Sequence, residues 1–289
     1  VKQWDYRYGG TGIDWFSSFQ QTTDGGYILG GYSYSDSSGD KSQNAWPNGN
    51  DYWVIKTNFA GNKQWDKRFG GTGLDELRSL QQTADGGYIL GGFSRSDTTG
   101  DKTQHNYDTT LSSSDYWLVK VDSLGTMQWN KRYGGTNDDL LNSVRQTRDG
   151  GYIAAGYTLS QMGGDITQPS PGSFDFWIVK TDAGGNKQWD KDFGGIGYDY
   201  LYSLNKAIDG GYILGGLSES NIGGDKTQPS WGLDDYWIIK IDSSGQKQWD
   251  KSFGGSKGDN LMAIDQTFDG GFILGGRTAS DSGTDVSQP

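Results

Sequence analysis

The chain repeats one segment five times, and this periodicity constrains its fold more than any other feature. The segment reads Lys63-Gln64-Trp65-Asp66 in its clearest copy. Its tryptophans lie 61, 64, 60 and 60 residues apart, at Trp4, Trp65, Trp129, Trp189 and Trp249. A fixed period of this length is typical of repeat architectures. Residues present in every copy are expected to build the repeat, and function is expected where the copies differ.

Each copy contains four segments with strand patterns. The first, as at 77–83, follows a Gly-Gly-x-x-x-Asp turn and carries a small residue at one offset: Ser18, Ser79, Ser143, Ser203 and Ala263. The second is Gly-Gly-Tyr-Ile-Leu-Gly-Gly, as at 86–92, and the third is Asp-Tyr-Trp-Val-Ile-Lys, as at 51–56. The fourth, as at 63–69, alternates apolar with polar or charged residues. No stretch shows a helical period.

These patterns order the strands from centre to rim. The second and third segments are apolar on both faces, as expected for strands that lie between neighbouring sheets. The alternating fourth segment suits an exposed edge, and the small residues of the first suit a crowded centre. Asp-Gly-Gly joins the first to the second, where Gly permits the positive φ of a tight hairpin. Four-stranded antiparallel units repeated radially form a β-propeller, and the rungs of a linear β-solenoid are much shorter than 60 residues.

The sequence therefore predicts an all-β fold, a five-bladed β-propeller with four-stranded antiparallel blades. Residues 1–289 are expected to form a single domain, with repeats starting near residues 2, 63, 127, 187 and 247. The same motifs resemble the sixty-residue propeller repeats of large secreted bacterial surface proteins, many of which carry a C-terminal sorting domain for outer-membrane export. The resemblance covers essentially the whole chain. It implies the fold and supplies no catalytic residues.

One strand is missing from the count. The first, second and fourth segments occur five times, but the third occurs four times, so the last blade lacks one inner strand. The fourth strand missing at the C-terminus is present at the N-terminus, at 2–8, which predicts a ring closed by pairing of this segment with 261–267 and 270–278. For the missing strand we weighed a longer parent chain, a strand supplied by a partner and an incomplete blade, and favoured the longer chain.

Composition excludes several function classes. The formal net charge of −11 disfavours nucleic-acid binding, which needs a basic surface. The chain has no Cys, so disulfides and thiolate metal sites are absent, and its apolar runs are too short for membrane insertion. It opens with Val1, inside a repeat, which suggests a processed or trimmed product. We expect a secreted or cell-surface protein.

Aspartates recur with the repeat in the loops expected on one face. A first series precedes the first strand of each copy and a second series lies in the long loop between the second and third strands. The two series are Asp14, Asp75, Asp139, Asp199 and Asp259, and Asp40, Asp101, Asp165, Asp225 and Asp285. These carboxylates are interpreted as acceptors for backbone N–H groups in their turns. The alternative is a ring of oxygen ligands for Ca²⁺. No other cofactor is expected.

The long loops also carry aromatic residues at one offset, six residues beyond the second Asp series. These are Trp46, Tyr107 and Trp231, with Pro171 at the fourth position. Glutamines recur at a matching place, at Gln43, Gln104, Gln168 and Gln228. Exposed rings stack on sugar faces while amides bind the hydroxyls, so glycan binding is one hypothesis. The other is that each ring packs on the neighbouring blade.

No catalytic residues are predicted. His105 is the single His and belongs to no repeated motif, so a Ser-His-Asp triad would rest on one unrepeated residue. A glycosidase pair needs one site unlike the others, whereas most carboxylates have five similar copies. The sequence predicts a non-catalytic interaction module or adhesin-type propeller that binds a glycan or protein partner through its long-loop face. A polysaccharide hydrolase using loop-face carboxylates and a structural spacer domain are the alternatives.

Overall fold

A computed structural model describes residues 4–281 and residue 285, and these residues form β-strands and loops without a helix. The strands group into antiparallel sheets, which we number 1 to 5 along the chain. Sheet 1 contains β1 (Asp14–Gln21), β2 (Tyr27–Ser33), β3 (Asp51–Thr57) and β4 (Lys63–Phe69). Sheet 2 contains β5 (Asp75–Gln82), β6 (Tyr88–Ser94), β7 (Asp115–Val121) and β8 (Met127–Tyr133).

The remaining sheets follow the same order. Sheet 3 contains β9 (Asp139–Gln146), β10 (Tyr152–Thr158), β11 (Asp175–Thr181) and β12 (Lys187–Phe193). Sheet 4 contains β13 (Asp199–Lys206), β14 (Tyr212–Ser218), β15 (Asp235–Ile241) and β16 (Lys247–Phe253). Sheet 5 contains only β17 (Asp259–Gln266) and β18 (Phe272–Thr278) among the described residues. The prediction of four-stranded antiparallel units is confirmed for sheets 1 to 4.

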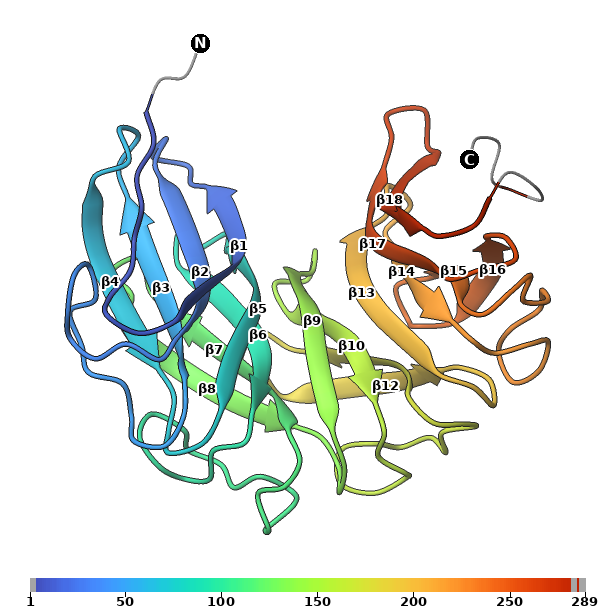
Figure 1. Ribbon diagram of the computed structural model, residues 1–289, viewed down its shortest axis with the longest axis horizontal. Helices are drawn as coiled ribbons and strands as arrows, with labels where there is room; N and C mark the ends of the chain where they lie inside the picture. Colours follow the sequence, from blue (N-terminus) through green and yellow to red (C-terminus); the bar gives the residue numbers. More distant parts are fainter. Residues whose placement is uncertain (1–3, 282–284, 286–289) are drawn as a thin grey trace.

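The sheets stand around a common centre as in a propeller, with the first strand of each sheet innermost and the fourth outermost (Figure 1). Serines at the crowded offset join the inner strands. Ser79 Oγ accepts the backbone N–H of Val144 at 3.2 Å, and Ser18 and Ser203 Oγ make the same bond to Leu80 and Ile264. The small residues thus bind the neighbouring inner strand, because only a short side chain leaves room for its backbone.

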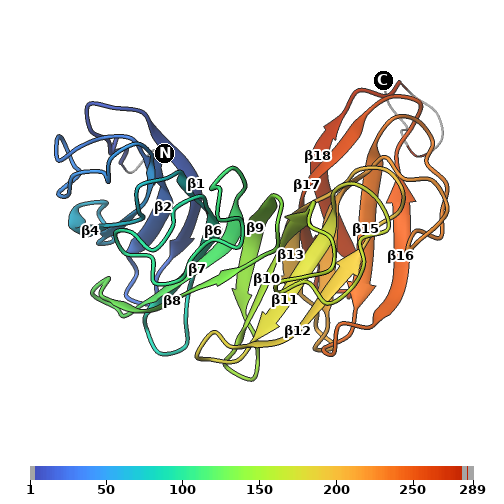
Figure 2. The ribbon, with the colours of Figure 1, turned by 90° about the horizontal axis from the view of Figure 1, so that it is seen from below.

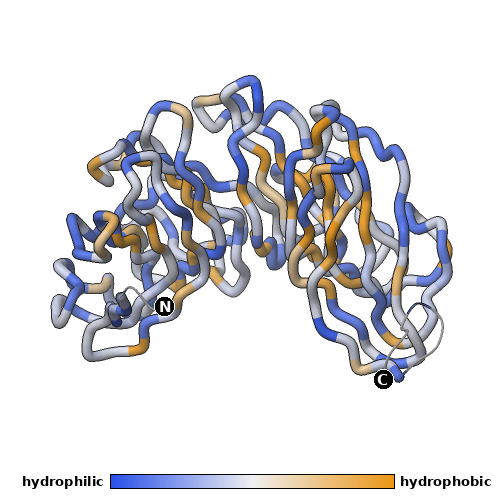
Figure 3. The backbone as a smooth tube through the Cα atoms, turned by 90° about the horizontal axis from the view of Figure 1, so that it is seen from above, coloured by the Kyte–Doolittle hydropathy of each residue, from blue (hydrophilic) through white to orange (hydrophobic). Residues whose placement is uncertain are grey.

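Apolar side chains fill the spaces between sheets. The tryptophan of each complete third strand is nearly or fully buried, as at Trp117 with 0% exposure. The ring of Tyr52 lies 4.9 Å from that of Trp117, and its hydroxyl donates to the Trp117 carbonyl at 2.9 Å. Figure 3 shows the apolar segments gathered in the sheets and the polar ones in the connecting loops. The predicted burial of the second and third strands is confirmed for sheets 2 to 4.

An ion pair within each complete sheet secures the Asp-Gly-Gly hairpin. The carboxylate of Asp85 lies 2.9 Å from Lys120 Nζ of the third strand, and Lys120 itself is buried. The same pair occurs as Asp24–Lys56, Asp149–Lys180 and Asp209–Lys240. Burial of the lysine stem and pairing of its charge explain why this position is invariant within the chain.

The sheets form an open arc, with sheets 1 and 5 at its two ends (Figure 2). The described residues of the N-terminal segment, 4–8, form no strand and do not join β17 and β18. Trp4 instead packs edge-on against Tyr27 at 5.6 Å, and the Tyr8 hydroxyl donates to the Gly61 carbonyl. Residues 2 and 3 of the expected pairing lie outside the described part. The predicted pairing of the two ends is therefore not made by residues 4–8.

Candidate functional site: the long-loop face

Strand register brings the recurring aspartates to one edge of every sheet. In sheet 1, Asp14 pairs with Ser33, and Ser33 pairs with Asp51 on its other side. The long loop from β2 to β3 leaves from this edge. Each sheet therefore presents two strand-initial aspartates and one long loop at the same end, while the hairpin turns lie at the other.

The first Asp series binds the turn that precedes it. Asp75 is fully buried, and its Oδ2 accepts the Gly71 N–H and the Ser96 hydroxyl, both at 2.8 Å. The bond to a glycine N–H four residues earlier, at 2.7–2.8 Å, recurs at Asp14, Asp139, Asp199 and Asp259. This geometry agrees with the interpretation that these carboxylates stabilise turns.

The second Asp series joins each loop to the preceding sheet. Asp101 Oδ2 accepts the Gly70 N–H at 3.2 Å, and its own N–H donates to the Gly70 carbonyl at 2.8 Å. The carboxylate bond recurs at 3.1–3.3 Å at Asp40, Asp165 and Asp225. The N–H of Asp285 lies 3.4 Å from the Gly254 carbonyl. In residues 4–281 and 285, no three acidic or His side chains form a group suited to a metal ion.

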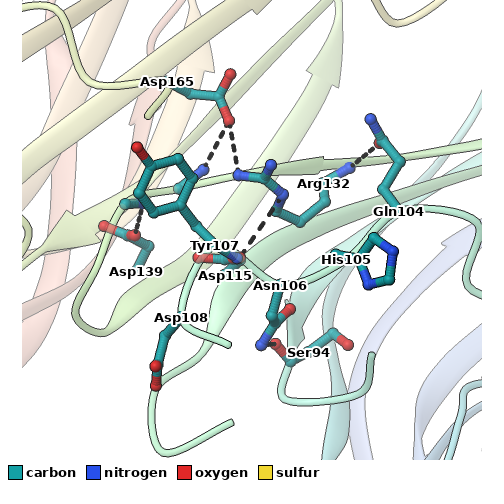
Figure 4. Close-up of polar contacts among 12 residues, drawn as sticks. Ser94, Gln104, His105, Asn106, Tyr107, Asp108, Asp115, Arg132, Asp139 and Asp165 are labelled. Atoms are coloured by element: carbon teal, nitrogen blue, oxygen red, sulfur yellow. Dashed lines mark hydrogen bonds and ion pairs between the residues drawn. The ribbon is translucent and has the colours of Figure 1, made fainter. Parts of the chain in front are cut away.

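Two of the loop aromatics stack on arginines of the fourth strand. The guanidinium of Arg68 lies 4.5 Å from the centre of the Trp46 ring, and that of Arg132 lies 5.5 Å from Tyr107. Arg132 also pairs with Asp165 of the next sheet at 3.0 Å and with Asp115 of its own sheet at 3.7 Å (Figure 4). Each ring also covers a glycine of the neighbouring loop, Gly100 or Gly164. These contacts match the hypothesis of packing on the neighbouring blade.

The arginine position changes in the last two complete sheets. Asp192 occupies it in sheet 3 and Ser252 in sheet 4, opposite the buried Trp177 and Trp237. Trp231 consequently has no arginine beneath its ring and is 50% exposed. Residues 282–284, in the loop of the following sheet, lie outside the described part of the chain. Of the three aromatic residues at this offset, Trp231 presents the most open ring.

Asp192 is a buried carboxylate without a hydrogen-bond partner. It is 7% exposed, and neither carboxylate oxygen is hydrogen-bonded. Burial, reinforced by the charges of Asp175 and Asp225, raises its pKa to about 9. Burial likewise raises the pKa of Asp175 to about 7. Where Arg132 neutralises the carboxylates of sheet 2, sheet 3 adds a further acidic group.

The glutamines of the proposed glycan site serve the scaffold. Gln104 Oε1 accepts the Arg132 N–H at 2.8 Å (Figure 4). The same bond to a fourth strand is made at 2.9–3.2 Å by Gln43, Gln168 and Gln228. Their amide oxygens are therefore already occupied. His105 lies apart from them, exposed, with its Nδ1 2.7 Å from the Asp97 carboxylate.

Sequence reasoning missed the strand-initial aspartates of the third strands as part of this face. Asp51, Asp115, Asp175 and Asp235 are at most 1% exposed. Asp51 Oδ2 accepts the Trp46 N–H at 2.8 Å, and Asp115 binds Tyr107 in the same way at 2.7 Å. The sequence carried a signal, because arginine at positions 68 and 132 accompanies an aromatic residue in the same repeat, whereas Asp192 accompanies Pro171.

A polar hollow lies at the centre of the arc, away from the loop face. It has a volume of about 400 Å³ and is lined by inner-strand residues that include Arg78, Asn142, Arg145 and Tyr202. Arg145 is held there by Asn205 and the Val144 carbonyl, at 3.1 and 2.9 Å. A second hollow of about 280 Å³ borders the free face of sheet 1, between Tyr6 and Trp15.

Comparison with known proteins gives distant similarities. No family model matches the chain. It is 28% identical over 214 residues to the regulatory protein FlaEY of Caulobacter vibrioides, a match that spans 71% of this chain and 22% of that protein. The chain thus spans less than a quarter of this relative's length.

Solved structures are similar at low sequence identity. Kuenenia stuttgartiensis hydrazine synthase has a TM-score of 0.49 at 11% identity, with 90% of this chain and 55% of that chain covered. The Neurospora crassa Pan2 WD40 domain has a TM-score of 0.40 at 11% identity, with 90% and 85% covered. In the described residues there is no helix able to cross a membrane.

Proposed function

We propose that this chain is a non-catalytic interaction module of the β-propeller type, which binds a partner through its long-loop face. The observation that carries the proposal is the half-exposed ring of Trp231, at a position where Trp46 and Tyr107 stack on arginines. A rigid ring beside the polar Ser230 and Gln228 suits the apolar face of a sugar. The proposal thus narrows a repeated glycan site to one principal site on sheet 4.

The acidic groups support a non-catalytic role. General acid–base catalysis requires a carboxyl group with a shifted pKa that can reach a substrate. The carboxyl groups whose pKa burial raises to between about 6 and 9 are Asp51, Asp75, Asp115, Asp175 and Asp192. All of them are at most 7% exposed and lie between strands rather than on the loop surface. A polysaccharide hydrolase would need such a group at the surface.

The finer architecture is part of the same proposal: one domain, five blades, and a ring that closes in solution. Trp4 contacts Tyr27 at 5.6 Å as Trp129 contacts Tyr152 at 5.6 Å. The N-terminal segment thus lies where an outer strand lies against the following sheet. The chain has no native Cys, so spin labels at Phe16→Cys and Ile273→Cys would report the distance between sheets 1 and 5. A single long distance would contradict closure.

A glycan array with the intact chain, with and without Ca²⁺, tests the binding role. We expect binding that Trp231→Ala abolishes while the melting temperature changes by less than about 2 °C. The matched control, Trp46→Ala, should lower the melting temperature because it removes a ring stacked on Arg68. Release of reducing ends from a polysaccharide would favour the hydrolase, and absence of any ligand would favour a structural spacer. Either result would contradict the proposal.

A further inference from the structure

β18 presents an open edge that every equivalent strand has covered. In sheets 1 to 4 the second strand pairs with the first strand on one side and the third on the other. β18 pairs only with β17 among the described residues. An open edge exposes a row of backbone donors and acceptors that another extended chain can join. This edge alone does not say which chain fits it.

The charge on the hairpin turn specifies one feature of the missing strand. In each complete sheet the turn aspartate pairs with the lysine of the third strand, as Asp209 does with Lys240 at 2.8 Å. Asp269 is the equivalent residue in sheet 5. Its carboxylate accepts only the Thr267 hydroxyl and the Gly271 N–H in the described part of the chain. A cation at the lysine position of an added strand would complete the pair.

Tyr236 specifies a second feature. The equivalent tyrosines, Tyr52 and Tyr116, stack on the third-strand tryptophan of the following sheet and donate to its carbonyl at 2.9 Å. The Tyr236 hydroxyl lies 2.6 Å from the Cβ position of Gly276, closely matching the 2.7 and 2.8 Å at the equivalent glycines. Among the described residues it has no acceptor, because the tryptophan-bearing strand is absent. The receptor for a tryptophan is therefore already in position.

The apolar face next to the open edge is also unfilled. Ile28, Ile89, Ile153 and Ile213 are 0% exposed, whereas Ile273, at the same position, is 63% exposed. Gly275 has no heavy atom within 4 Å of its Cβ position, although the equivalent Gly215 packs on Leu261. Both observations place an unoccupied apolar surface beside β18.

We propose that β18 binds an extended segment of another polypeptide with the pattern Asp-aromatic-Trp-aliphatic-aliphatic-Lys, added antiparallel as the third strand of sheet 5. The pairing of β14 with β15 gives the register. Asp235, Trp237 and Lys240 of β15 lie opposite Ser218, Gly216 and Ile213. The equivalent residues of β18 place the incoming Asp opposite Thr278, its Trp opposite Gly276 and its Lys opposite Ile273. Main-chain bonds supply affinity, while the Trp and Lys positions supply specificity.

A labelled peptide that copies residues 233–243 tests this site on the full 289-residue chain. We expect saturable binding by fluorescence anisotropy and slower amide exchange confined to β17 and β18. Asp269→Asn should weaken binding about tenfold, the loss of one charge-assisted bond. Asp122→Asn, a turn aspartate on sheet 2, is the matched control and should leave binding unchanged.

Two altered peptides complete the test. Replacing the peptide's lysine by glutamate should abolish binding, and Asp269→Lys in the protein should restore binding of that altered peptide. Replacing the peptide's tryptophan by alanine should also abolish it. Binding that ignores these changes, protection of another sheet, or absence of binding at millimolar peptide would overturn the proposal. Protection of β18 by a second copy of the chain, without peptide, would also overturn it.

Discussion

Arg132 and Asp192 occupy the same place in consecutive sheets, and they carry opposite charges. Arg132 lies between Asp115 and Asp165, at 3.7 and 3.0 Å, and neutralises both. Asp192 faces the equivalent Asp175 and Asp225 with neither of its oxygens hydrogen-bonded. The repeat tolerates this reversal because the surrounding strand pairing is unchanged.

Replacing Asp192 should stabilise the protein. Asp192→Ser copies sheet 4 and Asp192→Arg copies sheet 2, and each removes a buried, unpartnered acidic group. Relief of that group should raise the free energy of unfolding by about 1–3 kcal/mol at pH 8. Urea unfolding of both variants measures the change. A loss of stability in both would show that Asp192 has a favourable partner in solution.

Stability should fall as the pH rises from about 4 to 8. Burial raises the pKa of Asp51 to about 7 and that of Asp75 to about 6, above the value of 3.8 expected in the unfolded chain. The folded state therefore binds more protons over this range, so deprotonation favours unfolding. We expect a melting temperature about 5 °C lower at pH 8 than at pH 5. Asp51→Asn, which cannot ionise, should flatten the slope.

A second group of carboxylates acts at lower pH with the opposite sign. The pKa of Asp24 is lowered to about 2, chiefly by Lys56, and the pairing of Asp85 with Lys120 helps lower its pKa to about 2. Their contribution is present above about pH 4 and is lost as the pH falls toward 2. A stability that kept rising below pH 3 would contradict this assignment.

Two adjacent glycines of β6 should respond differently to alanine. A Cβ on Gly92 would lie 1.9 Å from the Glu76 carbonyl oxygen, a backbone atom that cannot move aside. A Cβ on Gly91 would meet only side chains, at 2.9–3.1 Å, and sheet 3 already has Ala155 there. Gly92→Ala should cost about 3 kcal/mol or more, and Gly91→Ala about 1 kcal/mol or less. Equal costs measured by denaturant unfolding would argue against this packing.

The tyrosine hydroxyl between third strands should be measurable in both directions. Tyr116→Phe removes the bond to the Trp177 carbonyl and should cost about 0.5–1.5 kcal/mol. Phe176 occupies the equivalent position in sheet 3, stacked on Trp237 at 4.9 Å. Phe176→Tyr should therefore add the bond and stabilise the chain by a similar amount. A neutral result for both would show that water satisfies these carbonyls.

The sequence predicted the sheets well because their patterns are local. Alternation, paired glycines and the Asp-Gly-Gly turn each act within one repeat, so β6 begins two residues from where the pattern placed it. The angle between sheets is not local, since it results from packing of many side chains across each interface. This is why residues 4–8 pack on sheet 1 in the structure, although the motif count led to an expected pairing with β18.

The site was predicted in part. The offset of Trp46, Tyr107 and Trp231 identified the right loops, but burial beneath each ring depends on a fourth-strand residue about 22–25 positions later in the chain. The turn role of Asp75 followed from its position after paired glycines. The unpartnered Asp192 could not be inferred from its own repeat, because its effect arises only where Asp175 and Asp225 of different sheets meet.

The bond from Ser79 to Val144 has a mechanical consequence. It joins sheets 2 and 3, as the contact of Ser203 with Ile264 joins sheets 4 and 5, and neither reaches beyond the adjacent sheet. A force applied at the two ends of the chain would therefore load these interfaces in series. Extension should proceed in steps of about one repeat, the two-stranded sheet 5 detaching first, rather than as a single all-or-none rupture.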